Sequence, residues 1–228
     1  MSSFEPESLA ADLEEHGYAV RPLLDPATCR SLEGLYDQDS PFRKRTVMER
    51  HGYGRGEYKY FAYPLPAIVA GLRARLYPPL AAVANQWRRN LGLEESFPDT
   101  LDAYLDRCHA AGQTRPTPLL LRYGKDGFNC LHQDLYGDLV FPLQIVTLLS
   151  DPGVDFTGGE FMLVEQRPRA QSRGEVVRPR QGDAVIFPVR ERPVRGTRGY
   201  HRVTMRHGVS RILSGSRHTL GIIFHDAA

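Results

Sequence analysis

The 228-residue chain is 41% hydrophobic and 25% charged, with a formal net charge of +2 at pH 7, a composition typical of a globular protein with one substantial core. No apolar run approaches the roughly 20 residues of a membrane span, and the acidic start MSSFEPESLAADLEEHG lacks the basic flank and apolar block of a signal peptide. Three cysteines (Cys29, Cys108, Cys130) are too few and too scattered for a disulfide framework or a cysteine zinc site. We therefore expect a cytoplasmic protein; its oligomeric state leaves no signal in the sequence.

The residues before about position 115 are predicted to be mainly helical. Apolar residues recur at helical spacing, with N-cap residues such as Asp25 before the first turn and glycines such as Gly17 after the last. The third predicted helix contains Pro78–Pro79, where we expect a break because proline lacks the N–H donor. The predicted helices span residues 8–17, 25–36, 64–93 and 98–112, and a short strand spans 18–24.

Residues 42–66 lie between two of these helices and are rich in glycine and tyrosine. Such a segment is typical of a lid over a site, and equally of an irregular hairpin packed on the surface. Its tyrosines Tyr58 and Tyr60, and Trp87 in the following helix, are expected to be core or lid residues rather than groups that stack on a substrate.

From residue 116 the pattern changes to short apolar runs separated by glycine, proline or aspartate. Eight such runs favour a sandwich, barrel or jelly roll over alternating βαβ units. We expect an α+β fold, mainly β in its core, forming one domain over residues 1–228. Residues 1–115 would be a helical N-terminal support with the lid, and residues 116–228 the β core. The runs span residues 117–124, 128–136, 140–150, 158–166, 174–181, 182–189, 200–213 and 217–226.

Positive charge is concentrated in the C-terminal half. Residues 166–217 contain 13 arginines against the three acids Glu175, Asp183 and Glu191, whereas the whole chain is only +2. An anion-attracting surface suited to an acidic substrate or to phosphates is one explanation. A preference for arginine that is unrelated to function is the other, and charge alone does not separate them.

The stretch NCLHQDLYGD, residues 129–138, places His132 and Asp134 two positions apart in a predicted strand. Side chains alternate across a strand, so both project from one face with their Cα atoms roughly 6.6 Å apart, which suits a shared metal ion. A hydrogen-bonded surface pair would leave the same pattern. Two histidines and one carboxylate are the ligands of non-heme Fe(II) oxygenases, so a second histidine must come from another strand.

Two histidines on a later predicted strand, His201 and His207, are candidates for that ligand. His207 precedes Arg217 by ten residues, and an inward-facing arginine needs an anion because a buried unpaired guanidinium is costly. A dicarboxylic cosubstrate would supply the anion, so we favour His207 and interpret His201 as a pocket-lining or strand-edge residue. The remaining histidines are expected at the surface or in the lid: His16, His51, His109, His218 and His225.

In this order, these residues make the sequence similar to the Fe(II)- and 2-oxoglutarate-dependent dioxygenases, closest to the prolyl-4-hydroxylase-like branch. The resemblance covers roughly residues 117–226 and rests on the segments LRYGKDGFNCLHQDLYGD, TLLSDPGVDFTGGEFMLVE, QGDAVIFP and HGVSRILSGSRHTLGIIF. It implies a double-stranded β-helix, or jelly roll, and an oxidoreductase that uses Fe(II), 2-oxoglutarate and O2. In such an enzyme, oxidative decarboxylation of 2-oxoglutarate to succinate accompanies hydroxylation of the substrate.

The resemblance also implies roles for particular residues. The catalytic iron ligands would be His132, Asp134 and His207. Arg217 would bind the distal carboxylate of 2-oxoglutarate, with Thr219 adding a hydrogen bond from the same strand face. The other implied cosubstrate contacts are Tyr123 and Gln144.

The substrate is expected to be a protein side chain or a small metabolite. A nucleic-acid demethylase of the alkylation-repair type is a less favoured alternative, because Leu121 and Ile223 stand where that branch has an asparagine and a second arginine. A further alternative is a non-catalytic binding module, or a zinc hydrolase that uses the same three metal ligands. Neither would have a use for Arg217. An anionic substrate could be met by an arginine-rich loop at the pocket mouth, namely Arg190, Arg192, Arg195 and Arg198.

Overall fold

The computed structural model describes residues 3–94, 96–167 and 169–228. Its centre is an antiparallel seven-stranded sheet. In spatial order this large sheet contains β1 (Ala19–Pro22), β11 (Asp183–Pro188), β7 (Leu143–Leu148), β15 (Arg217–Ile222), β5 (Leu119–Tyr123), β4 (Glu57–Phe61) and β2 (Phe42–Val47).

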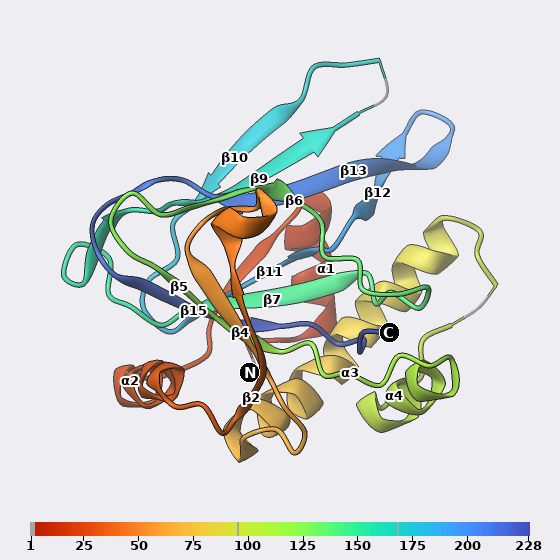
Figure 1. Ribbon diagram of the computed structural model, residues 1–228. Coiled ribbons are helices and arrows are strands. Elements are labelled where there is room, and N and C mark those ends of the chain that lie inside the picture. The colour runs from red at the N-terminus through yellow and green to blue at the C-terminus, as the bar shows by residue number, and fades with distance from the viewer. Residues whose placement is uncertain (1–2, 95, 168) are drawn as a thin grey trace.

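A second sheet lies across the inner face of the first (Figure 1). Its strands are β10 (Arg173–Val177), β9 (Phe161–Gln166), β13 (Gly199–Val209), β6 (Phe128–His132) and β3 (Gly54–Arg55), with β12 (Glu191–Gly196) paired to β13. The short pair β8 (Phe156–Gly158) and β14 (Ile212–Gly215) closes one end. The two antiparallel sheets form the expected jelly roll, so the predicted fold class is confirmed.

Helices cover the outer face of the large sheet: α1 (Pro6–Glu15), α2 (Pro26–Gly34), α3 (Ala67–Asn90) and α4 (Leu101–Ala110). The 3-10 turn η1 (Leu35–Asp37) follows α2, and a second 3-10 turn, η2 (Met48–His51), packs between the sheets through Met48. Side chains alternate along each strand, so Ile145 and Ile222 face the helices while Val185 and Tyr123 face the second sheet. The helices and the large sheet enclose the main apolar core, and the space between the sheets holds the site.

Helix α3 is continuous, so the predicted break at Pro78–Pro79 is wrong. Its buried face, which includes Leu76, Leu80 and Trp87, packs on the main core, and burying such side chains stabilises the helix by roughly 1.5–3 kcal/mol each. Pro78 lies on the exposed side, where water can bond the carbonyl groups that lose their N–H partners. Tertiary packing therefore outweighs the local cost of the prolines.

The first 115 residues contribute strands as well as helices. Strand β1 pairs with β11, and β2 and β4 extend the large sheet beyond β5. Residues 42–66 thus form part of the sheet through β2 and β4, while the η2–β3 segment between them reaches the space between the sheets and pairs with β6. The N-cap signal at Asp25 is confirmed: its side chain caps α2 by accepting a hydrogen bond from the N–H of Thr28.

None of the described helices is long and apolar enough to cross a membrane. The cytoplasmic location expected from the sequence stays a prediction.

A buried ion pair ties the C-terminus to α3. The Arg73 guanidinium is 1% exposed and donates to the carboxylate of Asp226 at 2.8 Å and to the carbonyl oxygens of Ile223 and Phe224 at 3.0 and 2.9 Å. Tyr63 donates to the same carboxylate at 2.8 Å. These bonds fix the segment that follows β15 against the helical layer.

Replacing Asp226 with alanine should therefore destabilise the protein strongly, because it leaves the Arg73 charge buried without its partner. The expected loss in free energy of unfolding is about 3–5 kcal/mol, measured by urea denaturation. Arg211→Ala is the control: it removes an exposed arginine 3.9 Å from Asp126 and should change stability by less than about 1 kcal/mol. Equal effects of the two variants would contradict this account.

Candidate active site

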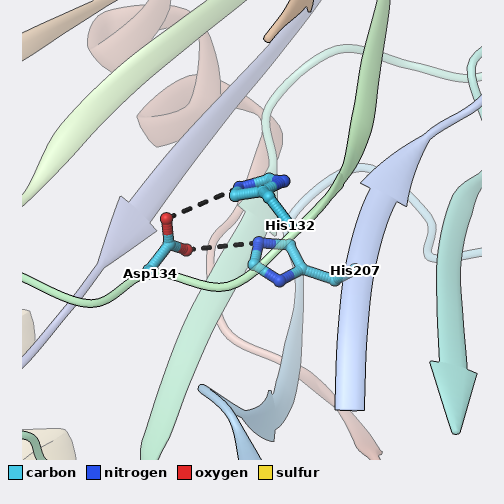
Figure 2. A group of neighbouring side chains, drawn as sticks. All are labelled: His132, Asp134 and His207. Carbon is cyan, nitrogen blue, oxygen red and sulfur yellow. Dashed lines mark ion pairs between the residues drawn. The ribbon is translucent and has the colours of Figure 1, made fainter. Parts of the chain in front are cut away.

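Three metal-ligand side chains meet between the two sheets. His132 ends β6, His207 lies on the neighbouring strand β13, and Asp134 follows β6 in the loop. The antiparallel register pairs His132 directly with His207. One ligand atom from each of the three residues lies within 4.8 Å of the others, and Figure 2 shows the Asp134 carboxylate facing both imidazole rings.

The three groups hold one another in place. The Asp134 carboxylate has Oδ1 at 3.5 Å from Nε2 of His132 and Oδ2 at 3.2 Å from Nε2 of His207. The Nδ1 atom of His132 lies 2.8 Å from the carbonyl oxygen of Cys130, which fixes the orientation of that ring. Both Nε2 atoms are therefore presented to the same small space as the carboxylate.

The electrostatics favour the protonation states that a metal needs at Asp134 and His207, but not at His132. Burial opposes the charged form of Asp134, but the facing histidines outweigh this effect and hold its pKa well below the usual value. Burial, followed by the nearby His132, lowers the pKa of His207. Burial opposes the charged form of His132, but the hydrogen bond to Asp134 outweighs it and raises the pKa of that ring, so a metal would have to displace a proton there. Two imidazoles and one carboxylate are nevertheless the donor set that fits Fe(II).

A cavity of about 430 Å³ opens over this cluster. The large sheet supplies its floor, where Arg217, Thr219, Tyr123 and Gln144 face the same space as the three-residue cluster. The structure therefore places all seven residues implied by the resemblance around one cavity.

The Arg217 side chain is a buried cation, and two of its nitrogen atoms lack a hydrogen-bond partner among the described residues. The side chain is 2% exposed, and the two atoms are Nε and Nη1. Burial lowers its pKa to about 10. Its guanidinium carbon lies 5.8 Å from the ring centres of Tyr123 and Phe156, and Gly159, at φ +65°, is packed so closely that an added Cβ would lie 3.0 Å from Cδ of Arg217.

A buried, unpaired guanidinium is stable only with an anion or another acceptor nearby. The cradle around Arg217 leaves its polar atoms free and faces the cavity, so it fits the distal carboxylate of a dicarboxylic cosubstrate.

The remaining implied contacts flank Arg217. Tyr123 pairs with Arg217 in the register of β5 and β15, and its hydroxyl accepts a hydrogen bond from Asn129 at 3.2 Å. Thr219 is 2% exposed, two residues along the same strand. Gln144 on β7 is buried, and its Nε2 has no partner in the described part of the chain.

A tyrosine-rich wall lies beside these cosubstrate contacts on the same sheet, where Thr219 pairs with Leu121 and Leu121 with Tyr58. Tyr58 and Tyr60 line the cavity, together with Leu121 and Ile223. The hydroxyl of Tyr136 donates a hydrogen bond of 2.8 Å to Oδ1 of Asp134. Sequence reasoning missed Tyr136 although it ends the predicted strand 128–136 with the same parity as His132 and Asp134, which was the available signal. The strand itself ends at His132, so Tyr136 lies in a loop.

Three other expectations can be compared with the structure. His201 is exposed, and the metal-ligand cluster contains His207 instead. The interpretation of His225 as a surface residue is wrong: the side chain is 0% exposed and burial lowers its pKa to about 4. His225 follows β15, so strand alternation no longer predicts its direction. His218 is partly buried, with its ring 5.9 Å from that of Tyr36.

The arginine-rich loop does not behave as expected for Arg192, which is 2% exposed. Its guanidinium binds the carboxylate of Glu165 and donates to the carbonyl oxygens of Leu13 and Glu14 at the end of α1. Arg192 therefore joins α1 to the second sheet and is not available to a substrate. The other three arginines are exposed but lie outside the described lining of the cavity: Arg190, Arg195 and Arg198.

Comparisons with known proteins give one family and one fold. The family model Oxygenase-NA, described as "Oxygenase, catalysing oxidative methylation of damaged DNA", matches residues 56–227. Two uncharacterized proteins of Mycobacterium tuberculosis, MT2286 from strain CDC 1551 and Rv2227 from strain H37Rv, are each 52% identical over 191 residues, which is 82% of this chain and 82% of each relative.

Solved structures support the same fold at low identity. A Pseudomonas putida prolyl-4-hydroxylase is 15% identical with a TM-score of 0.53, covering 98% of this chain and 100% of that one. An oxidoreductase of the 2OG-Fe(II) oxygenase family from Burkholderia pseudomallei is 17% identical with a TM-score of 0.57, covering 98% and 92%.

The geometry predicts which histidine variant loses the metal. His207→Ala should weaken Fe(II) or Mn(II) binding to the metal-free protein by at least about tenfold, because it removes one of three donors. The measurement is an anaerobic calorimetric titration. His201→Ala, on the exposed part of the same strand, is the matched control and should bind as the wild type does. The reverse pattern would show that His201 is the ligand.

Proposed function

Because the chain belongs to the Oxygenase-NA family, we propose that it is an Fe(II)- and 2-oxoglutarate-dependent oxygenase that hydroxylates a C–H bond of a substrate held in the cavity between its sheets. The single observation that carries this proposal is the unpaired Arg217 guanidinium beside the His132–Asp134–His207 cluster. A zinc hydrolase or a binding module with the same three ligands would have no use for a buried cation there.

In this proposal His132, Asp134 and His207 hold Fe(II). When bound, iron together with 2-oxoglutarate and O2 supplies the oxidising power for the C–H bond, while 2-oxoglutarate is converted to succinate and CO2. Three protein ligands leave coordination positions free for these molecules. The roles of the chain itself are to bind, to orient and to keep water away from the reacting groups.

Arg217 would bind the distal carboxylate of 2-oxoglutarate, which satisfies its free N–H groups at once. Tyr123 and Thr219, on the same floor of the cavity, would add hydrogen bonds, and the unpartnered amide of Gln144 would donate to the cosubstrate from the next strand. The low accessibility of Arg217 strengthens its interaction with an anion, because water competes little inside the protein.

The tyrosine-rich wall would then face the substrate. Apart from the three ligands and Arg217, the described residues around the cavity include no aspartate, glutamate, lysine, arginine or histidine. This supports an uncharged reacting group, such as a carbon of a protein side chain or of a small metabolite, packed against Tyr58, Tyr60 and Ile223.

A cytoplasmic location of the protein remains part of the proposal.

The family model favours a second candidate, oxidation of a damaged base in DNA, since its description names that substrate. Planar tyrosine rings can stack on a base. The polar contacts expected for alkylation repair are absent at two wall positions, however, because Leu121 and Ile223 both line the cavity. We therefore keep hydroxylation of a protein side chain or metabolite as the first candidate.

The proposal predicts a specific loss in Arg217→Ala. The dissociation constant for 2-oxoglutarate in the presence of Fe(II), followed anaerobically by the visible charge-transfer band, should rise by at least about tenfold, because a charged hydrogen-bond partner is lost. Metal binding should remain. Arg206→Ala removes an exposed arginine from β13 in the second sheet and is the matched control. Unchanged 2-oxoglutarate affinity in Arg217→Ala would refute the cosubstrate assignment.

Succinate formation identifies the substrate class. The holoenzyme is incubated with 2-oxoglutarate and, in separate reactions, with proline-containing peptides, free amino acids, or single-stranded DNA that carries N-methylated bases. Stimulated succinate with a stable product heavier by one oxygen atom is the expected result. Release of formaldehyde with the DNA alone would instead establish the second candidate, because a hydroxylated N-methyl group breaks down to formaldehyde.

A further inference from the structure

Tyr136 makes a contact that the proposed function does not use. Its hydroxyl donates to Oδ1 of Asp134 at 2.8 Å, while no hydroxyl group bonds Oδ2 in the described part of the chain. Oδ2 is also the oxygen nearer to a histidine nitrogen, at 3.2 Å from His207, compared with 3.5 Å between Oδ1 and His132. The two oxygens of this carboxylate therefore have different surroundings.

The ring of Tyr136 is held from several sides. It meets the ring of Tyr60 edge to face at 6.1 Å and lies 6.0 Å from the ring of His225. It also packs on the small apolar cluster that includes Leu119 and Ile223. Its carbonyl oxygen accepts the backbone N–H of Ala228 at 3.1 Å. With the ring fixed in this way, the hydroxyl can reach Asp134 without further loss of side-chain freedom.

The fixed ring is needed because Asp134 has no strand to orient it. β6 ends at His132, so the backbone that carries Asp134 is a loop, and a free carboxylate there could turn either oxygen toward the histidines. Ligands of metal sites are commonly oriented by hydrogen bonds from groups that do not touch the metal. Tyr136 stands in that relation to Asp134.

We propose that Tyr136 is a positioning residue for the metal site: it engages Oδ1 of Asp134 and thereby presents Oδ2 as the oxygen that binds the metal. The inference rests on the proposed metal site and adds to it the group that orients its only carboxylate. Loss of the hydroxyl frees the carboxylate to rotate, so the metal binds less tightly and in a less defined geometry.

The test compares Tyr136→Phe with Tyr58→Phe. Both variants keep an aromatic ring on the cavity wall, and only the first removes a hydrogen bond to Asp134. The dissociation constant for Mn(II), measured on the metal-free proteins by the electron paramagnetic resonance signal of the free ion, should rise roughly 10–100-fold in Tyr136→Phe. It should stay at the wild-type value in Tyr58→Phe.

Two further measurements separate positioning from a general structural role. Melting temperatures of the metal-free proteins report on folding, and the visible absorption of Co(II) at saturation reports on ligand geometry in whatever fraction is folded. A changed Co(II) spectrum in Tyr136→Phe alone supports the proposal even if that variant is less stable. Mn(II) affinity and a Co(II) spectrum equal to those of the wild type overturn it.

The same experiment keeps this inference apart from the proposed function. If the wild-type protein binds neither Mn(II) nor Co(II), the metal site itself is wrong. If the wild type binds both and Tyr136→Phe binds them equally well, the metal site stands and only the positioning role fails.

Discussion

The pairing of β6 with β13 is the constraint on which the site depends. Antiparallel pairing places His132 directly opposite His207, although 74 positions separate them in the chain. A shift of one residue in this register would turn one of the two imidazoles to the outer face of the sheet. The position of β13 is also fixed by its pairing with β9 on its other edge, where His207 pairs with Leu163. The placement of the two histidine ligands is therefore a property of the sheet as a whole.

The large sheet provides the other half of the site by the same alternation. Arg217 and Thr219 on β15 point into the space between the sheets, while Leu220 and Ile222 on the same strand pack against the helices. One face of the strand is thus anchored in the main core, and this anchoring allows the opposite face to carry a cation with unsatisfied N–H groups. The helical layer, which the Arg73–Asp226 pair ties to the segment after β15, affects the site by holding that strand rigidly in place.

Much of this arrangement could be predicted from the sequence, because its rules are local. Strand alternation and turn residues predicted a sandwich, barrel or jelly roll, and spacing predicted that Arg217 and Thr219 would share one strand face. Non-local packing decided the rest. Helix α3 continues through Pro78–Pro79 because a buried face compensates for the lost hydrogen bonds, and Arg192 is buried because α1 and Glu165 surround it. Tyr136 was overlooked although it ended the predicted strand 128–136. The strand stops at His132, so the direction of the Tyr136 side chain depends on what it packs against, here Tyr60 and the C-terminal segment.

The buried guanidinium of Arg217 also bears on how the protein tells ligands apart. A molecule that coordinates the metal but ends in a neutral group would occupy the cavity and still leave Nε and Nη1 unpaired. A ligand with a neutral end is then rejected mainly because it leaves the buried N–H groups of Arg217 without hydrogen bonds. The extra attraction between Arg217 and an anionic ligand contributes less to this selectivity. Discrimination of this kind tolerates variation along the middle of the ligand, but it requires an anionic end at a fixed distance from the metal.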